Sequence, residues 1–162
     1  MTELVEHVSA DGRVVEIVTR QQMRERLLRH RCCYVAVLTT GDEVVVHQRA
    51  SWKDVYPGWW DLCFGGVCGV GEDWEPSALR ELMEEAGLEA KLTELGRGAY
   101  EGDDGSVIGR VYLARSDAEP NCPDGEVVAT DRVPRADLAR WAEGRQVCLD
   151  SLQIVLPLLN SW

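Results

Sequence analysis

A glycine-rich loop that leads into a short acidic helix constrains the fold of this chain more than any other feature. The segment 66–88 reads GVCGVGEDWEPSALRELMEEAGL. Pro76 suits the first turn of a helix and Gly87 suits a C-terminal cap, so the sequence predicts a helix over 75–86. The glycine spacing resembles a Walker A loop, but Glu72 and Asp73 replace its Lys-Ser/Thr pair, which excludes a P-loop.

The predicted helix has an apolar side and an acidic side. At 100° per residue, its apolar side consists of Leu79, Leu82, Met83 and Ala86. Glu81, Glu84 and Glu85 fall on the other side, where Glu81 and Glu85 repel each other by ~0.2–0.5 kcal/mol. A divalent cation reverses that penalty, because Mg²⁺ and Mn²⁺ prefer carboxylate oxygens. A solvated acidic surface is the alternative interpretation.

Length and charge limit the class of protein. The chain has 162 residues and a formal net charge of -11, which predicts a single domain over residues 1–162 that does not bind nucleic acid polymers or anionic membranes. The N-terminus lacks a secretory pattern and no apolar run is long enough to span a bilayer, so we expect a cytoplasmic protein. Its six cysteines are then expected as reduced thiols.

The other elements follow from periodicity and turn residues. Thr19 and Gln22 form a capping-box pattern, Gly41-Asp42 and 103–105 predict tight turns, and Pro157 is expected to interrupt the last helix. Predicted strands cover 13–20, 33–40, 43–49, 61–66, 90–101, 106–116 and 126–133, and further predicted helices cover 19–30, 134–144 and 150–162. Because strands and helices do not alternate regularly, we expect a mixed α/β fold with a mixed β-sheet between α-helices.

The segment 66–88 also resembles a known motif. It reads G-x5-E-x7-R-E-U-x-E-E-x-G-U, where U is aliphatic, with the fixed positions filled by Gly66, Glu72, Arg80, Glu81, Leu82, Glu84, Glu85, Gly87 and Leu88. This pattern is similar to a complete Nudix box. The resemblance implies a Nudix fold with a loop–helix–loop motif, and a hydrolase that cleaves the diphosphate bond of a nucleoside diphosphate linked to another moiety, or of a similar phosphorylated metabolite.

The resemblance also implies roles for individual residues. Glu81, Glu84 and Glu85 would hold Mg²⁺, with Mn²⁺ as an alternative, and the Gly65 carbonyl would be a further ligand. Arg80 and Glu72 would position the helix and its loop. A bound metal neutralises charge on the diphosphate and lowers the pKa of a water. A carboxylate then takes the proton of the attacking water, and the candidates are Glu81 and Glu126. An ordinary strand-end acid is the alternative for Glu126.

A second resemblance, over about residues 13–160, is to isopentenyl-diphosphate isomerases and their hydrolase-like bacterial relatives. In the isomerases a basic pair ahead of W/Y-P-G holds the diphosphate, and Arg49 and Lys53 stand at the matching positions. Two exposed basic side chains are the alternative for that pair. Gly65 and Val67 stand where the isomerases carry their catalytic Cys and His. The sequence therefore predicts hydrolysis, with an isomerase-like enzyme or a non-catalytic Nudix-fold binding module as alternatives.

Several side chains keep two interpretations at this point. His30 matches an isomerase metal-ligand position but Met23 replaces the second such histidine, so His30 is a structural side chain or a ligand. A zinc site on His30 with Cys32 and Cys33 is a minor alternative. The cluster of Trp52, Trp59 and Trp60 anchors the core or lines a pocket. The sequence is compatible with a homodimer but does not establish one.

Overall fold

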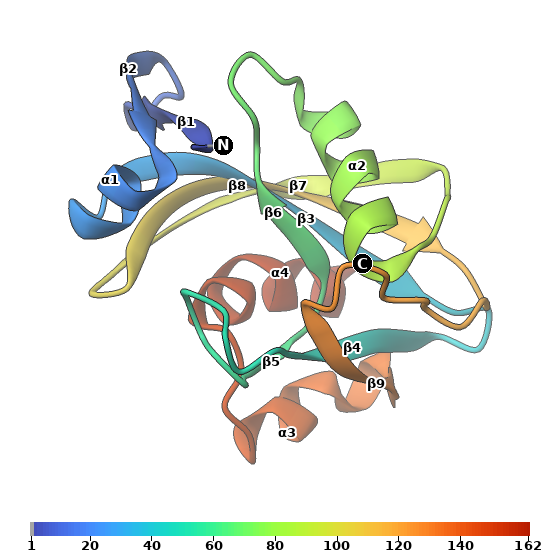
Figure 1. The fold of residues 1–162 in the computed structure, drawn as a ribbon. Helices are drawn as coiled ribbons and strands as arrows, with labels where there is room; N and C mark the ends of the chain where they lie inside the picture. The colour runs from blue at the N-terminus through green and yellow to red at the C-terminus, as the bar shows by residue number, and fades with distance from the viewer. Residues whose placement is uncertain (1) are drawn as a thin grey trace.

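In the computed structural model, which describes residues 2–162, a mixed sheet has helices on both faces and an N-terminal hairpin beside it (Figure 1). The elements in chain order are β1 (Leu4–Val8), β2 (Val14–Thr19), α1 (Arg20–Glu25), β3 (Arg29–Leu38), β4 (Glu43–Arg49), β5 (Trp60–Asp61), β6 (Phe64–Val67), α2 (Trp74–Ala86), β7 (Leu92–Gly102), β8 (Gly105–Arg115), β9 (Val127–Pro134), α3 (Leu138–Glu143) and α4 (Leu149–Ser161). A 3₁₀ turn, Arg135–Asp137, precedes α3. The expected mixed α/β fold is confirmed.

Strand β3 is the centre of the seven-stranded sheet. It runs parallel to β8 over its whole length, and the order across the sheet is β5-β4-β3-β8-β7. On its other edge β3 pairs antiparallel with β6 through Cys32–Val35, but with β4 only at Leu38. Strands β4 and β6 therefore share one edge of β3 and diverge from each other, which leaves room between them for the segments that connect them.

Alternation along β3 creates two hydrophobic cores. Tyr34, Ala36 and Leu38 face one core together with side chains of α4, whereas Val35 and Val37 face a second core together with side chains of α2. The ribbon view shows α2 on one side of the sheet and α4 on the other (Figure 1). Because side chains of one strand point to alternate faces, an unbroken apolar strand such as β3 needs cover on both faces.

The N-terminal region differs from its predicted form. The capping box of Thr19 and Gln22 is present, but α1 ends at Glu25 instead of continuing to residue 30. Leu27 has a φ of 51°, a left-handed conformation that an α-helix cannot continue through. His30 therefore lies within β3, and the prediction that it sits at a helix end is wrong. The hairpin partner β1 was not predicted.

Two other boundaries are corrected. The single strand expected over 61–66 is two short strands, because β5 pairs with β4 while β6 pairs with β3. The last helix, α4, continues across Pro157 and is not interrupted there. The hairpin of β7 and β8 and the strand β9 appear close to their predicted places. No helix within residues 2–162 is long and apolar enough to cross a membrane.

Candidate active site

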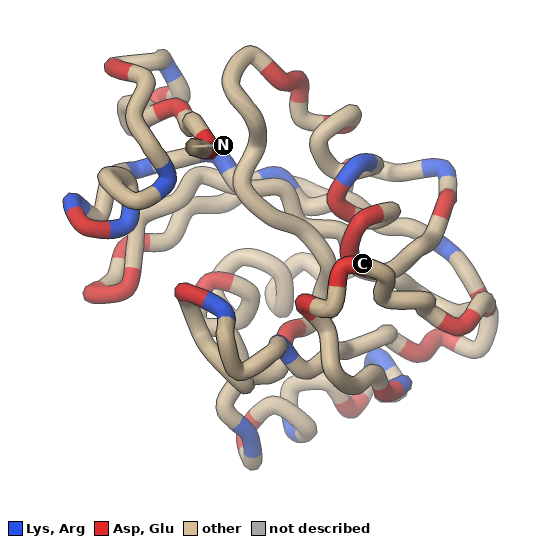
Figure 2. The backbone as a smooth tube through the Cα atoms, viewed as in Figure 1, with Lys and Arg blue, Asp and Glu red and all other residues tan. Residues whose placement is uncertain are grey.

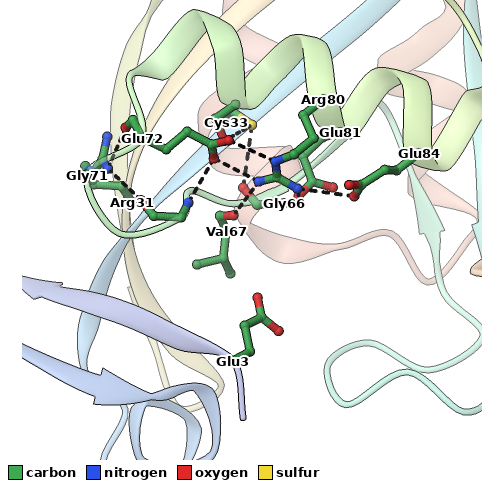
Figure 3. Close-up of polar contacts among 12 residues, drawn as sticks. Glu3, Arg31, Cys33, Gly66, Val67, Gly71, Glu72, Arg80, Glu81 and Glu84 are labelled. Carbon is green, nitrogen blue, oxygen red and sulfur yellow. Dashed lines mark hydrogen bonds and ion pairs between the residues drawn. The ribbon is translucent and has the colours of Figure 1, made fainter. Parts of the chain in front are cut away.

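The glycine-rich loop is fixed to the middle of α2 by a network of ion pairs and hydrogen bonds (Figure 3). Glu72 accepts two hydrogen bonds from Arg80, from Nε and from Nη2, each 2.9 Å long. Arg31 of β3 donates to the Glu72 carbonyl at 2.8 Å and to Glu6 at 2.8 Å. Arg80 hydrogen bonds hold the pKa of Glu72 at about 2, so its carboxylate stays ionised. Loop, helix and N-terminal hairpin thus form one connected unit.

The buried face of α2 differs from the predicted one. Its buried residues are Ser77, Ala78, Leu82, Glu85 and Ala86, while Leu79 and Met83 are each 39% exposed. The small side chains of Ala78 and Ala86 let that side of the helix approach the sheet closely. The buried face of α2 is consequently rotated about the helix axis relative to the predicted face, so that it excludes Leu79 and Met83 and includes Glu85. Glu85 is only 5% exposed, whereas Glu84 stays at the surface.

Gly66 makes room for the carboxylate of Glu81. A Cβ atom at Gly66 would lie 2.8 Å from the Glu81 carboxylate carbon, so any side chain there would displace that group. Arg80 Nη1 donates to Glu81 at 2.9 Å and to Glu84 at 3.2 Å. An i,i+4 contact between Arg80 and Glu84 is therefore present, and it is longer than the two hydrogen bonds of Arg80 with Glu72.

A cavity of about 440 Å³ opens beside these acids. Its walls come from α2, β6, β3, α1, the loop between β4 and β5, and the tip of the β7–β8 hairpin. In Figure 2, acidic positions gather on the second half of α2, and both acidic and basic positions occur on the loop between β4 and β5. All the predicted site residues line this cavity, namely Arg49, Lys53, Gly65, Arg80, Glu81, Glu84, Glu85 and Glu126.

The two predicted phosphate-binding residues have protein partners. Lys53 Nζ is 2.9 Å from Glu126 Oε2, and its side chain is only 10% exposed. Arg49 donates from Nε and Nη2 to the Val55 carbonyl, at 3.2 and 2.9 Å. Arg49 Nη1 also lies 3.9 Å from Asp61 Oδ2. Both cations therefore stabilise the loop between β4 and β5 while lining the same cavity as the acidic helix.

Burial controls the protonation of the helix acids. Burial, opposed by Arg80 and assisted by Glu84, raises the pKa of Glu81 to about 7. Burial next to Glu81 raises the pKa of Glu85 well above its usual value. Within residues 2–162 Glu85 makes no hydrogen bond or ion pair. A buried carboxylate without a partner is costly, and a bound cation is one way to compensate it.

The donors fit a hard divalent cation, although their present positions do not enclose one. Carboxylate and carbonyl oxygens are the ligands of Mg²⁺ and Mn²⁺. In the part of the chain that the structure describes, no three His, Cys, Asp or Glu side chains are grouped closely enough to hold a metal. Arg80 occupies the space between Glu81 and Glu84. Metal binding at these residues thus requires Glu81 and Glu84 to turn away from Arg80.

The zinc alternative and the isomerase cysteine both conflict with the strand geometry. Cys32 and Cys33 point to opposite faces of β3, so they cannot join His30 around one ion. A Cβ atom at Gly65 would lie 2.0 Å from the Cys33 carbonyl oxygen, which leaves no room for a side chain. Cys63 and Cys68 are buried beside Ser151 and Ser77, and neither lines the cavity.

The three tryptophans divide between the two interpretations left open by the sequence. Trp60 packs edge-on against Trp141, with ring centroids 5.5 Å apart, and contributes to the core beside α4. Trp52 is 64% exposed and lines the cavity. Trp59 is half-buried, and its ring centroid lies 5.0 Å from that of Tyr56.

Sequence reasoning missed part of the cavity. Tyr34 donates from its hydroxyl to Asp150 Oδ2 at 2.8 Å, and both residues line the cavity together with Asp104. The period-2 series His30, Cys32 and Tyr34 along one strand was a usable signal that these side chains share a face. Asp104 and Asp150 had no comparable signal, because only the packing of the hairpin tip and of α4 brings them to the cavity.

Comparison with known proteins identifies relatives of the whole fold. The family model described as NUDIX domain matches residues 28–152. The chain is 36% identical over 161 residues to an uncharacterized Nudix hydrolase, PA4841, of Pseudomonas aeruginosa, covering 98% of this chain and 95% of that protein. The crystal structure of DR0079 from Deinococcus radiodurans matches with a TM-score of 0.80 and 23% identity, covering 98% of each chain. The NUDIX domain of Shewanella oneidensis NrtR, complexed with ADP ribose, matches with a TM-score of 0.66 and 17% identity, over 89% of this chain and 98% of that one.

Proposed function

The chain belongs to the Nudix hydrolase family, and we propose that it is a Mg²⁺-dependent enzyme that cleaves the diphosphate bond of a nucleoside diphosphate linked to another moiety. Mn²⁺ is the alternative metal. The observation that carries the proposal is Glu85, a buried carboxyl group that makes no hydrogen bond or ion pair with the described residues 2–162, next to Glu81 in a cavity that also contains Arg49 and Lys53. A buried carboxylate in that position is stabilised by a bound cation. The same cation would neutralise the negative charge of a diphosphate.

Each residue of the site has a role in this proposal. Glu81, Glu84, Glu85 and the Gly65 carbonyl would hold the metal. When bound, it would supply charge neutralisation for the diphosphate and would lower the pKa of a water molecule. Arg80 is a positioning residue, because it joins α2 to the Glu72 carboxylate. Main-chain carbonyls and carboxylates already engage the basic side chains Arg49 and Lys53, so phosphate oxygens would replace existing hydrogen-bond acceptors rather than order free side chains.

Two carboxylates are candidates for the general base. Glu81 has a pKa near 7, which suits proton transfer at neutral pH. The Glu126 carboxylate is held by Lys53, and its main-chain carbonyl accepts a hydrogen bond from the Ala50 amide at 2.8 Å, so its position is fixed by two contacts with one loop. The variant Glu126→Gln distinguishes the two candidates. If Glu126 is the base, kcat falls sharply, whereas if Glu126 is only a structural acid, kcat is largely retained.

Isomerisation is the second candidate activity, and the backbone opposes it. The position that matches the isomerase cysteine is Gly65, where the Cys33 carbonyl excludes any Cβ. Cys63 and Cys68 lie outside the cavity lining. The NUDIX domain of NrtR is complexed with ADP ribose, a nucleoside diphosphate with a linked group, and this ligand is consistent with the proposed substrate class.

The experiment that tests the proposal measures phosphate and nucleotide release from nucleoside diphosphates, triphosphates and diphosphate conjugates, with Mg²⁺ or Mn²⁺. The control variants are Glu84→Gln and Glu85→Gln. We expect metal-dependent release in the parent and its loss in both variants. Absence of turnover on every compound, with metal binding equal in all three proteins, would contradict the proposal and support a binding module.

Location and assembly remain predictions from the sequence. We expect a single domain over residues 1–162 in the cytoplasm, acting on a small-molecule diphosphate and not on nucleic acid polymers or membranes. A homodimer is compatible with this activity. Cell fractionation and the molar mass in solution would test these two points directly.

A further inference from the structure

The N-terminal unit, residues 3–26, lies outside the part of the chain that the family model matches, which is residues 28–152. Its strands β1 and β2 form a separate two-stranded sheet at one corner of the molecule, followed by α1 (Figure 1). The cavity nevertheless includes Glu3, Arg20 and Arg24 in its lining. The unit therefore reaches the candidate active site, and it does so through contacts with two loops.

The first contact is a buried ion pair behind the glycine-rich loop. Glu6 Oε1 of β1 lies 2.8 Å from Arg31 Nη2 of β3, and the two side chains are only 9% and 11% exposed. Glu6 Oε1 also accepts a hydrogen bond from the Gly71 amide at 3.4 Å. Arg31 donates to the carbonyls of Gly69 and Glu72, at 3.3 and 2.8 Å. One buried carboxylate of the N-terminal unit thus contacts both Arg31 and the loop that precedes α2.

That loop sets the orientation of the helix acids. The Glu72 carboxylate accepts hydrogen bonds from Arg80, and Arg80 in turn donates to Glu81 (Figure 3). Glu6 lies outside the cavity lining, so its influence on Glu81 passes through Arg31 and the loop. A displacement of about 1 Å at a reacting centre can cost roughly 100-fold in rate, even when the altered residue is remote from the chemistry.

The second contact holds the loop between β4 and β5. Asp54 Oδ2 lies 3.4 Å from Arg20 Nε and 3.1 Å from Arg24 Nε, both on α1. Burial opposes ionisation of Asp54, but Arg24 and Arg20 lower its pKa to about 2, so the carboxylate stays charged. The next residue back along the chain, Lys53, pairs with Glu126 at 2.9 Å. The loop that carries the proposed phosphate-binding lysine is thus held at two adjacent residues.

We propose that the N-terminal unit is part of the active site, with Glu6 as a positioning residue for the helix acids and Asp54 as a positioning residue for Lys53. The inference rests on the proposed hydrolase function and assigns the two contacts to different kinetic constants. Glu6 acts on groups that would hold the metal during the reaction, so its loss lowers kcat. Asp54 acts on a group that would bind the diphosphate before the reaction, so its loss raises KM.

The test measures kcat, KM and Tm of Glu6→Gln and Asp54→Asn with saturating Mg²⁺. The substrate is ADP-ribose or, if the parent does not cleave it, the nucleoside diphosphate, triphosphate or diphosphate conjugate that the parent cleaves fastest. We expect Glu6→Gln to lower kcat roughly 10- to 100-fold with KM little changed. We expect Asp54→Asn to raise KM roughly fivefold with kcat retained.

Glu16→Gln is the matched control. Glu16 lies in the same hairpin, and its 2.8 Å ion pair with Arg26 is made within the N-terminal unit. Both kinetic constants should therefore keep their parental values in this variant. A contribution of the unit to folding alone would lower the Tm of all three variants and leave kcat and KM of the folded protein unchanged.

The sign of the KM change separates positioning from direct contact. Asp54 lines the cavity, so removal of its charge from an otherwise unmoved loop would reduce the repulsion of an anionic substrate and lower KM. A rise in KM therefore supports positioning, and an unchanged or lower KM would overturn the role of Asp54.

A second variant guards against a folding defect in Glu6→Gln. Arg31→Lys keeps a positive charge beside Glu6 but removes the guanidinium fork that reaches the loop carbonyls, so kcat should fall while circular dichroism stays parental. Parental kcat in both Arg31→Lys and Glu6→Gln would overturn the inference and leave the hydrolase intact. Absence of turnover of every compound by the parent would instead overturn the proposed function itself, and with it this inference.

Discussion

Helices α2 and α4 have the same length and cover opposite faces of the same sheet, yet their cavity-lining acids differ in their partners. Each has 13 residues and brings a carboxyl group to the cavity, the buried Glu85 from α2 and the half-buried Asp150 from α4. Asp150 has a tyrosine hydroxyl and a main-chain amide as partners. Glu85 has no hydrogen-bond partner in residues 2–162. A partnered acid is consistent with the folded chain alone, whereas the unpartnered Glu85 is the group that the proposed metal would compensate.

We expect the largest effect from Glu85→Gln, which tests whether the unpartnered acid of α2 binds the metal. We expect kcat for diphosphate hydrolysis to fall at least ~1,000-fold, because a ligand of the metal is lost. In the absence of metal the variant should be at least as stable as the parent, because a neutral amide replaces a buried carboxyl group that makes no hydrogen bond or ion pair within residues 2–162. Glu89→Gln, an exposed position just after α2, is the control. A stability decrease in metal-free Glu85→Gln would show that Glu85 has an unrecognised structural partner.

Metal addition tests the role of Glu85 in the absence of any diphosphate substrate. At 100 times its dissociation constant, a metal that binds only the folded state stabilises it by about 2.7 kcal/mol. We therefore expect Mg²⁺ or Mn²⁺ to raise the Tm of the parent and to leave Glu85→Gln nearly unchanged. Differential scanning calorimetry with EDTA as the reference measures this effect. An equal shift in both proteins would place the metal away from α2.

Two glycine substitutions test how closely each helix approaches the sheet. A Cβ at Gly66 would press on the Glu81 carboxylate at 2.8 Å, and a Cβ at Gly98 would press on Ile154 of α4 at 3.0 Å. We expect Gly66→Ala to lower activity more than stability. Gly98→Ala should lower the free energy of unfolding by ~1–2 kcal/mol with activity retained, as in other overpacked cores. Urea unfolding and kcat, measured for both variants, distinguish an effect on activity from an effect on stability. Loss of activity in Gly98→Ala with activity retained in Gly66→Ala would contradict a catalytic role for α2.

Asp150 gives the free energy of unfolding a pH dependence. Burial and the nearby Asp61 raise the pKa of Asp150 from 3.8 to about 6, while Tyr34, Ser151 and Arg49 lower it. Because the pKa of Asp150 is higher in the folded state, protonated Asp150 favours the folded state. This contribution to the free energy of unfolding is complete below pH 3.8 and is lost as the pH rises through about 6. Asp150→Asn should flatten the stability profile in that window by ~1–3 kcal/mol. An unchanged profile, measured by urea unfolding at pH 4, 5 and 6, would show that Asp150 stays ionised.

Much of the site was predictable because the motif is local. The spacing of Glu72, Arg80 and Glu84 within one loop and helix fixes which side chains meet, and the structure shows those contacts. The hairpin of β7 and β8 likewise followed from its turn residues. Boundaries failed where long-range pairing decided the outcome. Residues 26–30 have helix-forming side chains, but the chain enters β3 through the left-handed Leu27.

The sequence by itself determined that this chain contains a Nudix box with its acids on one short helix, because that pattern depends only on neighbours along the chain. Only the tertiary structure decided which acid is buried, because the small side chains of Ala78 and Ala86 turn Glu85 toward the sheet. It also decided what shares the cavity. Asp104 and His30 line the same cavity because β3 pairs with β8, where His30 is the register partner of Val107.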